Sequence, residues 1–257
     1  MSAVLDPSAV PADLVALTRS LGERSREQAI LAEGNTSYRL DDERIVVKTS
    51  GSNLGRATAD DFVVVDNAPL VDLLHDPAAT QADLTAALDA GEHEGRRVRA
   101  SIETLVHIAV QAVAPASWVA HTHPTAVVGL LASVQAETIF AEAVYSDEAV
   151  VLATPLFVPY AEPGLALGKL VHDGLRRRFD ETGELPRLVL LANHGIVAIA
   201  ESAPGADGIC EMAVKSATVR HIALTAGGLQ PVPRDSLAKF VLRSEVSERR
   251  QRLGRGT

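Results

Sequence analysis

Cysteine, basic residues and long apolar runs are all scarce in this sequence. Cys210 is the one cysteine, so the chain cannot form an internal disulfide, and its apolar surroundings predict a buried thiol without a chemical role. No apolar run approaches the roughly 20 residues that a membrane-spanning helix needs. The N-terminal stretch MSAVLDPSAVPADL lacks a basic segment followed by a continuous apolar one. We therefore expect no signal peptide, no membrane partner and a cytoplasmic location.

Basic residues are outnumbered, with 24 Lys and Arg against 33 Asp and Glu and a net charge of −9. Because nucleic-acid binding normally needs a basic surface, this balance argues against a nucleic-acid partner. The positive charge is concentrated at the C-terminal end, where residues 215–257 carry nine Lys and Arg against three Asp and Glu. We expect residues 230–257 to form a basic, solvated helical tail that frays, with a subunit contact as the alternative.

The chain is long enough, at 257 residues of which 47% are hydrophobic, to bury a sizeable core. Apolar periodicity predicts helices over residues 11–27, 70–74, 82–88, 103–113, 125–131, 165–179 and 206–224. Strands are expected over residues 38–40, 44–48, 62–65, 118–120, 149–153, 188–191 and 196–199. This alternation predicts one α/β domain, spanning residues 1–257, with a mixed central sheet.

Three histidines follow predicted strands. His121 and His123, in VAHTHP, can both point to one face because residues i and i+2 of a strand share a face, and Pro124 ends the strand there. His194, in LANHG, lies between two apolar strands. If these strands are neighbours, three imidazoles with an open fourth position describe a catalytic metal site. The alternative is a pair of solvated strand-end histidines and a simple turn at His194.

Glu103, in SIETLVHIAV, is the best carboxylate candidate near this strand, and Ser101 is a candidate helix cap. A carboxylate in a first helical turn also has a structural explanation, because the helix dipole favours it. His107 lies on the same helical face, where we expect it to pack beneath the site, with a contact to Glu103 as the alternative. Two polar stretches, residues 34–37 (GNTS) and 49–52 (TSGS), resemble anion-binding loops and indicate a small phosphorylated or carboxylated ligand.

In this order, the segments AEGNTS, KTSGSNL, SIETLVH, VAHTHP, VPYAEPG and LANHG resemble the class II aldolase/adducin family. The resemblance covers roughly residues 10–225. It implies a single α/β/α domain with a mostly antiparallel central sheet, and a homotetramer with active sites at subunit interfaces. It also implies a Zn²⁺ cofactor, or another divalent metal such as Mn²⁺ or Co²⁺.

The resemblance also assigns roles to individual residues. It matches His121, His123 and His194 to the metal-binding histidines, and Glu103 to the acidic residue that ligates the resting metal and serves as acid/base. The positions that match the substrate phosphate site are Asn35, Ser50, Gly51 and Ser101. Tyr145 matches the proton donor that a neighbouring subunit supplies, with a half-buried aromatic residue as the alternative.

These matches imply a metal-dependent aldolase, a lyase of carbohydrate metabolism that cleaves a ketose or ketose phosphate through a metal-stabilised enediolate. The family aldolases carry two serines before the acidic residue, whereas Ser101-Ile102 stands here. KTSGSNL also looks more like the loop of rhamnulose phosphate aldolase domains fused to dehydrogenases. A substrate that is a non-phosphorylated or acidic sugar therefore stays open.

Other activities also stay open. Related 4-epimerases carry Asp where Glu103 stands, while related sugar-acid phosphate decarboxylases keep Glu. An adducin-like assembly module without enzymatic activity is a further alternative, although such domains lose metal ligands that this chain keeps. A Schiff-base aldolase would use Lys48, which we interpret instead as a surface or phosphate-facing cation.

Overall fold

The computed structural model describes residues 2–246 and 248. In this part of the chain, eight strands form one sheet in the order β1-β4-β3-β2-β7-β10-β9-β8. The strands are β1 (Ala3–Val4), β2 (Asn35–Arg39), β3 (Arg44–Lys48), β4 (Phe62–Asp66), β7 (Trp118–Thr122), β8 (Leu156–Val158), β9 (Leu188–Leu191) and β10 (Gly195–Ala200). Neighbouring strands are antiparallel except β8 and β9, which are parallel, so the predicted α/β class with a mostly antiparallel sheet is confirmed.

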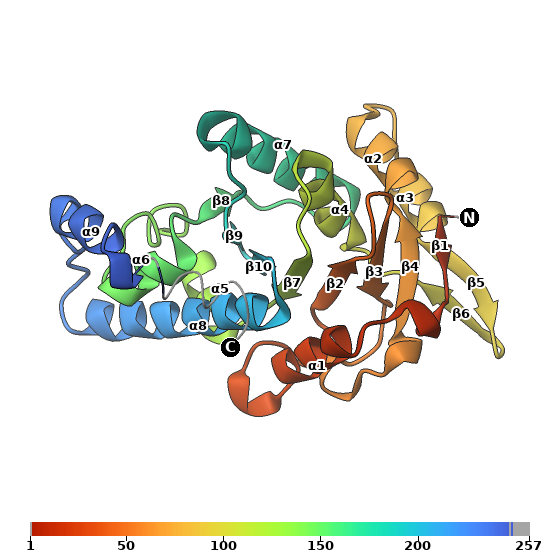
Figure 1. Ribbon diagram of the computed structural model, residues 1–257, viewed down its shortest axis with the longest axis horizontal. Coiled ribbons are helices and arrows are strands. Elements are labelled where there is room, and N and C mark those ends of the chain that lie inside the picture. Colours follow the sequence, from red (N-terminus) through yellow and green to blue (C-terminus); the bar gives the residue numbers. More distant parts are fainter. Residues whose placement is uncertain (1, 247, 249–257) are drawn as a thin grey trace.

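Helices cover both faces of the sheet, as Figure 1 shows. One face carries α2 (Asn67–His75), α3 (Gln81–Ala87), α4 (Thr104–Val113) and α7 (Leu165–Thr182). The other carries α1 (Ala12–Leu21), α5 (Thr125–Leu131), α6 (Ser146–Leu152) and α8 (Ala203–Thr225). Among the described residues, no helix is both long and apolar enough to cross a membrane.

The sheet is buried on both faces, which explains why its strands read as continuous apolar runs. Successive residues of a strand belong to different cores: Val119 packs with α4 and α7, and the next residue, Ala120, packs with α1 and α8. In such strands a polar side chain is buried wherever it points. Those of Asn35 and His121 therefore need polar partners inside the protein.

Two local predictions of element type need correction, and one hairpin was not predicted. Residues 149–153 were expected to be a strand but lie mainly in α6, because a short apolar run fits either structure, and the strand is β8 beyond Pro155. Residues 35–37 were expected in a polar loop but belong to β2, where their side chains are buried. The hairpin of β5 (Asp89–His93) and β6 (Arg96–Arg99) was not predicted, because its charged residues hide the strand pattern.

The predicted basic tail is described only in part. It contains α9 (Arg234–Val241), which has no buried residue. Residues 247 and 249–257 lie outside the described part of the chain, so the predicted fraying there stays a prediction.

Helix α1 ends at Leu21, earlier than predicted, where the chain packs against a second glycine. A Cβ atom on Gly22 would lie 2.0 Å from the backbone nitrogen of Gly55 and 2.5 Å from its Cα. Both atoms belong to backbone, so they cannot move aside as a flexible side chain would. The close approach therefore requires glycine at residue 22.

We expect Gly22→Ala to lower the free energy of unfolding by about 1–3 kcal/mol, since the added methyl forces backbone shifts. Gly208→Ala is the control, because a Cβ at this position in α8 meets nothing within 4 Å. That substitution should stabilise the protein by about 0.5–1 kcal/mol through helix propensity. Urea denaturation measures both changes, and equal stability of the two variants would contradict the prediction.

Candidate metal centre

His121 and His123 lie where β7 ends. His121 has the same orientation as Val119, toward the face that α4 covers, and His123 follows one residue beyond the strand. Asn35 of β2 is paired directly with His121 in the sheet register. Glu103 is the residue just before α4, but its carboxylate does not cap that helix. Its position is therefore explained by the histidines it contacts rather than by the helix.

His194 lies in the tight turn between β9 and β10. Asn193 takes the left-handed conformation there, with φ of 54°, which asparagine tolerates better than most residues. A Cβ on Gly195 would lie 2.3 Å from the carbonyl oxygen of Thr122 and 2.8 Å from the His123 ring. The turn residues asparagine and glycine thus let His194 approach His121 and His123.

The structure brings together all four residues predicted to form a metal site. One ligand atom from each of Glu103, His121, His123 and His194 lies within 4.8 Å of the others. The Glu103 carboxylate bridges two histidines, with Oε2 3.1 Å from His121 Nε2 and Oε1 2.7 Å from His194 Nε2. The Nε2 atoms of His121 and His123 are 2.9 Å apart.

This donor set fits a divalent metal. His121 Nδ1 lies 2.8 Å from the carbonyl oxygen of Ile196, to which it donates, so in the neutral ring the lone pair is on Nε2, which faces the cluster. His194 Nδ1 is buried and has no hydrogen-bond partner among the described residues. Three imidazole nitrogens and one carboxylate oxygen suit Zn²⁺, Mn²⁺ or Co²⁺. These four residues could therefore hold the ion.

The electrostatics of the cluster favour an ionised carboxylate. Burial alone would raise the pKa of Glu103, but His121 and His194 outweigh it and hold the pKa well below its usual range. Burial lowers the pKa of His121, yet the Glu103 carboxylate raises it overall. Burial, followed by the charge of His121, lowers the pKa of His123 to about 3, so its ring is neutral and available as a ligand.

Residues 12–221 match the sequence profile described as the Class II Aldolase and Adducin N-terminal domain. The chain belongs to this family.

Solved structures of class II aldolase relatives share the fold. L-Fuculose-1-phosphate aldolase from Thermus thermophilus superposes with a TM-score of 0.59 at 21% identity, covering 84% of this chain and 98% of the other. YgbL from Escherichia coli, named as a candidate aldolase, epimerase or decarboxylase, gives a TM-score of 0.63 at 20% identity, covering 88% and 95%. At these identities the likeness shows the fold alone.

One curated relative is longer. An uncharacterized oxidoreductase, YuxG of Bacillus subtilis, is 26% identical over 239 residues, which is 85% of this chain. The chain spans 32% of that relative's length. The activity in that name belongs to the longer protein.

The residues matched to the substrate phosphate site of class II aldolases fall into two groups. Asn35 and Ser101 are buried, and the Asn35 amide nitrogen donates to Ser101 Oγ and to Glu103 Oε2, each at 3.0 Å. Ser50 and Gly51 are exposed in the turn after β3, where the Ser50 backbone nitrogen donates to the carbonyl oxygen of Arg99 at 2.9 Å. Asn35 and Ser101 therefore lie beside the Glu103 carboxylate, which Asn35 contacts directly, whereas Ser50 and Gly51 are accessible to a ligand.

Lys48 is not at the surface, and that part of its interpretation is wrong. Its side chain is 1% exposed, and Nζ donates to the carbonyl oxygens of Thr49 at 2.9 Å and Ser52 at 2.7 Å. Burial lowers its pKa to about 8. Lys48 therefore stabilises the turn that contains Ser50 and Gly51. Its interpretation as a cation that faces the substrate phosphate stays a prediction.

Tyr145 lies just before α6, and its described contacts are with α8. Its hydroxyl donates to Met212 Sδ at 2.9 Å, and Lys215 Nζ lies 5.7 Å from the centre of its ring. Burial raises its pKa to about 12. Neither of these two contacts, within the part of the chain that the structure describes, involves the four clustered residues. Its predicted role as a proton donor at the cluster therefore requires a neighbouring copy of this chain.

Glu33 was not among the residues singled out in the sequence. Its Oε1 lies 3.9 Å from His123 Nδ1, on the side of the ring away from His121. The sequence feature that could have indicated Glu33 is its position as a carboxylate inside the segment AEGNTS, two residues before Asn35.

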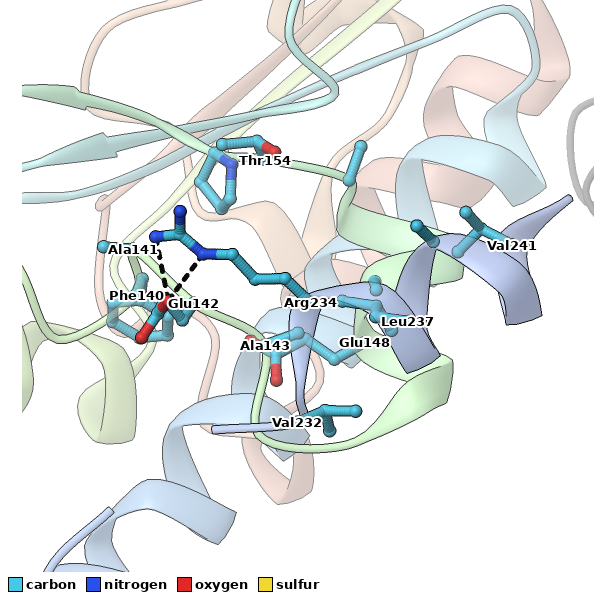
Figure 2. A pocket seen from close by; sticks show the side chains of 14 residues that line it. Phe140, Ala141, Glu142, Ala143, Glu148, Thr154, Val232, Arg234, Leu237 and Val241 are labelled. Carbon is cyan, nitrogen blue, oxygen red and sulfur yellow. Dashed lines mark hydrogen bonds and ion pairs between the residues drawn. The ribbon is translucent and has the colours of Figure 1, made fainter. Parts of the chain in front are cut away.

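Two cavities lie elsewhere, and neither is lined by a residue of the cluster. The first, of about 470 Å³, lies between residues 140–155 and α9, where Arg234 contacts Glu142 (Figure 2). The second, of about 770 Å³, lies between the C-terminal end of α7 and the first half of α8. Neither adds a group to the chemistry of the four clustered residues.

Proposed function

We propose that this chain is a divalent-metal-dependent aldolase, a lyase that cleaves a ketose or ketose phosphate. The main support for this proposal is that three imidazoles and the buried carboxylate of Glu103 converge on one point, in a member of the class II aldolase family. The likeness to fuculose phosphate aldolase supports the reaction class. A sugar or sugar phosphate is the proposed partner.

A divalent metal in this site supplies a Lewis acid that stabilises negative charge developing on oxygen beside the reacting carbon. In the condensation direction, Glu103 takes a proton from the carbon next to the substrate carbonyl. Its low pKa keeps the carboxylate ionised for this step. Tyr145 of a neighbouring copy then protonates the aldehyde oxygen after the carbon–carbon bond forms. Cleavage runs the same proton transfers in reverse.

We propose that the exposed turn with Ser50 and Gly51 receives the anionic end of the substrate. Backbone N–H groups and hydroxyls of such a turn can hold a phosphate or carboxylate. Ile102 replaces the second serine before the acidic residue and is 42% exposed, so one hydroxyl of the phosphate site is absent. The proposed substrate class therefore includes ketoses without a phosphate. We further propose an oligomer, because the proposed role of Tyr145 requires a neighbouring copy, and a homotetramer is the assembly that the family resemblance implies.

A decarboxylase of 3-oxo sugar acids is the second candidate. Glu103, rather than aspartate, is the feature that favours it over a 4-epimerase, and the likeness to YgbL supports keeping it. Both reactions need the same stabilised negative charge beside a carbonyl. The complete ligand set argues against an adducin-like binding module.

The test is metal analysis followed by product analysis. Purified protein, loaded with Zn²⁺, Mn²⁺ or Co²⁺ or stripped with a chelator, is incubated with phosphorylated and free ketoses and 3-oxo acids, and products are followed by NMR. We expect an aldehyde and a ketone fragment from the loaded protein alone. Carbon dioxide without an aldehyde would select the decarboxylase. Full lyase activity in stripped protein would contradict the metal role, and bound metal without turnover would favour the binding module.

A further inference from the structure

A row of buried polar residues extends behind Glu103 into the core between β2 and α4. Ser37 Oγ lies 2.6 Å from His107 Nδ1, and His107 Nε2 contacts Oδ1 of Asn35. The Asn35 amide nitrogen then lies 3.0 Å from Glu103 Oε2. Asn35, Ser37 and His107 are each no more than 1% exposed. Every polar atom in this row must therefore be satisfied within the protein.

Only one arrangement of protons satisfies the row. An ionised carboxylate accepts hydrogen bonds and cannot donate them, so the NH₂ group of Asn35 must face Glu103. Oδ1 of Asn35 then faces His107 and needs a donor, which places the imidazole proton on Nε2. Nδ1 is left as an acceptor for the Ser37 hydroxyl. Burial lowers the pKa of His107 to about 3, which agrees with this neutral tautomer.

The reverse arrangement carries a clear penalty. If the amide of Asn35 turned over, its oxygen would face the Glu103 carboxylate, and two acceptors would meet in a site with little solvent. An asparagine amide has no intrinsic preference between the two orientations. Two neighbours select the same orientation: the Glu103 carboxylate accepts from the amide nitrogen, and His107 Nε2 donates to Oδ1, so removing the His107 donor removes one of the two.

We propose that His107 is a positioning residue that fixes the amide of Asn35 and, through it, the carboxylate of Glu103 within the cluster. Asn35 contacts Oε2, the same oxygen that His121 contacts, while Oε1 faces His194. The amide thus sets the rotation of the carboxylate between the two histidines. Partners of this kind behind metal ligands typically change metal affinity about 10–100-fold when removed. The inference rests on the proposed metal site.

The test compares His107→Leu with His107→Gln. Leucine fills much of the imidazole volume without a donor, whereas glutamine can still donate to Oδ1. Thr104→Val is the matched control on α4, because Thr104 is fully buried next to Glu103 and its hydroxyl has no partner among the described residues. Zn²⁺ and Mn²⁺ affinities are measured without substrate, by competition with a chromophoric chelator, and folding is checked by circular dichroism.

We expect His107→Leu to weaken metal binding about 10–100-fold, while His107→Gln and Thr104→Val stay within about threefold of the unchanged protein. Folded His107→Leu protein with unchanged affinity would overturn the proposal. If that variant does not fold, Ser37→Ala is measured in its place. This substitution removes only the hydroxyl that donates to His107 Nδ1, and it should weaken metal binding about fivefold. Unchanged affinity in Ser37→Ala would then overturn it.

The same experiment separates this proposal from the proposed function. Unsubstituted protein that binds neither metal contradicts both. Unsubstituted protein that binds metal beside a His107→Leu variant of equal affinity contradicts only the role of His107.

Discussion

Glu103→Gln is expected to lower kcat for ketose cleavage by roughly 10²–10⁴-fold, the usual contribution of a positioned acid/base group. Glutamine has nearly the same shape and its side-chain oxygen can still accept from Asn35, but it cannot exchange a proton at carbon. The loss should appear mainly in kcat, because the proton moves after the substrate is bound. A coupled assay for the aldehyde product measures it.

The control for this prediction is Glu33→Gln. Glu33 is also a carboxylate beside a histidine of the cluster, but its closest approach is 3.9 Å and more than a third of its side chain is exposed. We expect a change of less than about tenfold in kcat, since it contacts no group that transfers a proton. Metal content is measured for both variants, so that loss of the ion is separated from loss of the base. A Glu103→Gln variant that keeps both its metal and its full rate would rule out the acid/base role.

The three histidines stand out in the sequence because each lies at the end of an apolar strand. A strand buried on both faces reads as an apolar run, so polar residues at its end stand out, and alternation places His121 and His123 on one face. The asparagine and glycine around His194 indicate a turn, which the structure contains. What sequence could not supply is the neighbour relation of β7 and β10, which brings the end of β7, with His121 and His123, next to the turn that carries His194.

His107 was expected to pack beneath the site and is fully buried there, but the strand residues of the buried row behind Glu103 were missed for a physical reason. Asn35, Thr36 and Ser37 are typical of turns, and short-range propensity therefore predicts a loop. In the structure they form β2, because β7 pairs with them and their side chains find partners on α4 and α1: His107 for Ser37, and Thr18 for Thr36. Polar residues in a strand are stable only when distant segments supply those partners, and a single sequence does not show which segments meet.

Arg220 is a second case in which the partners are distant in sequence. It lies in α8, is fully buried, and its guanidinium lies 2.6 Å from Glu148 of α6. It also donates to the carbonyl oxygens of Ile139 at 2.8 Å and Glu142 at 2.9 Å and lies over the ring of Phe140. One side chain thus joins α8, α6 and the segment that leads to Tyr145.

We expect Arg220→Met to lower the free energy of unfolding by about 3–5 kcal/mol, since it leaves the Glu148 carboxylate buried without its counter-charge. Arg220→Met combined with Glu148→Gln should recover part of this loss, because the double variant buries no unpaired charge. Urea denaturation at neutral pH measures all three proteins.

Arg176→Met tests whether burial, rather than ion pairing itself, sets the size of the effect. Arg176 and Asp180 lie 3.2 Å apart on α7, but their side chains are 55% and 58% exposed, so water screens the pair. We expect a change of less than about 1 kcal/mol there. The contrast follows from desolvation, which makes an unpaired charge costly only where water cannot reach it. If Arg220→Met unfolded at the same urea concentration as Arg176→Met, the buried pair would not be what holds the segment before Tyr145 to α8.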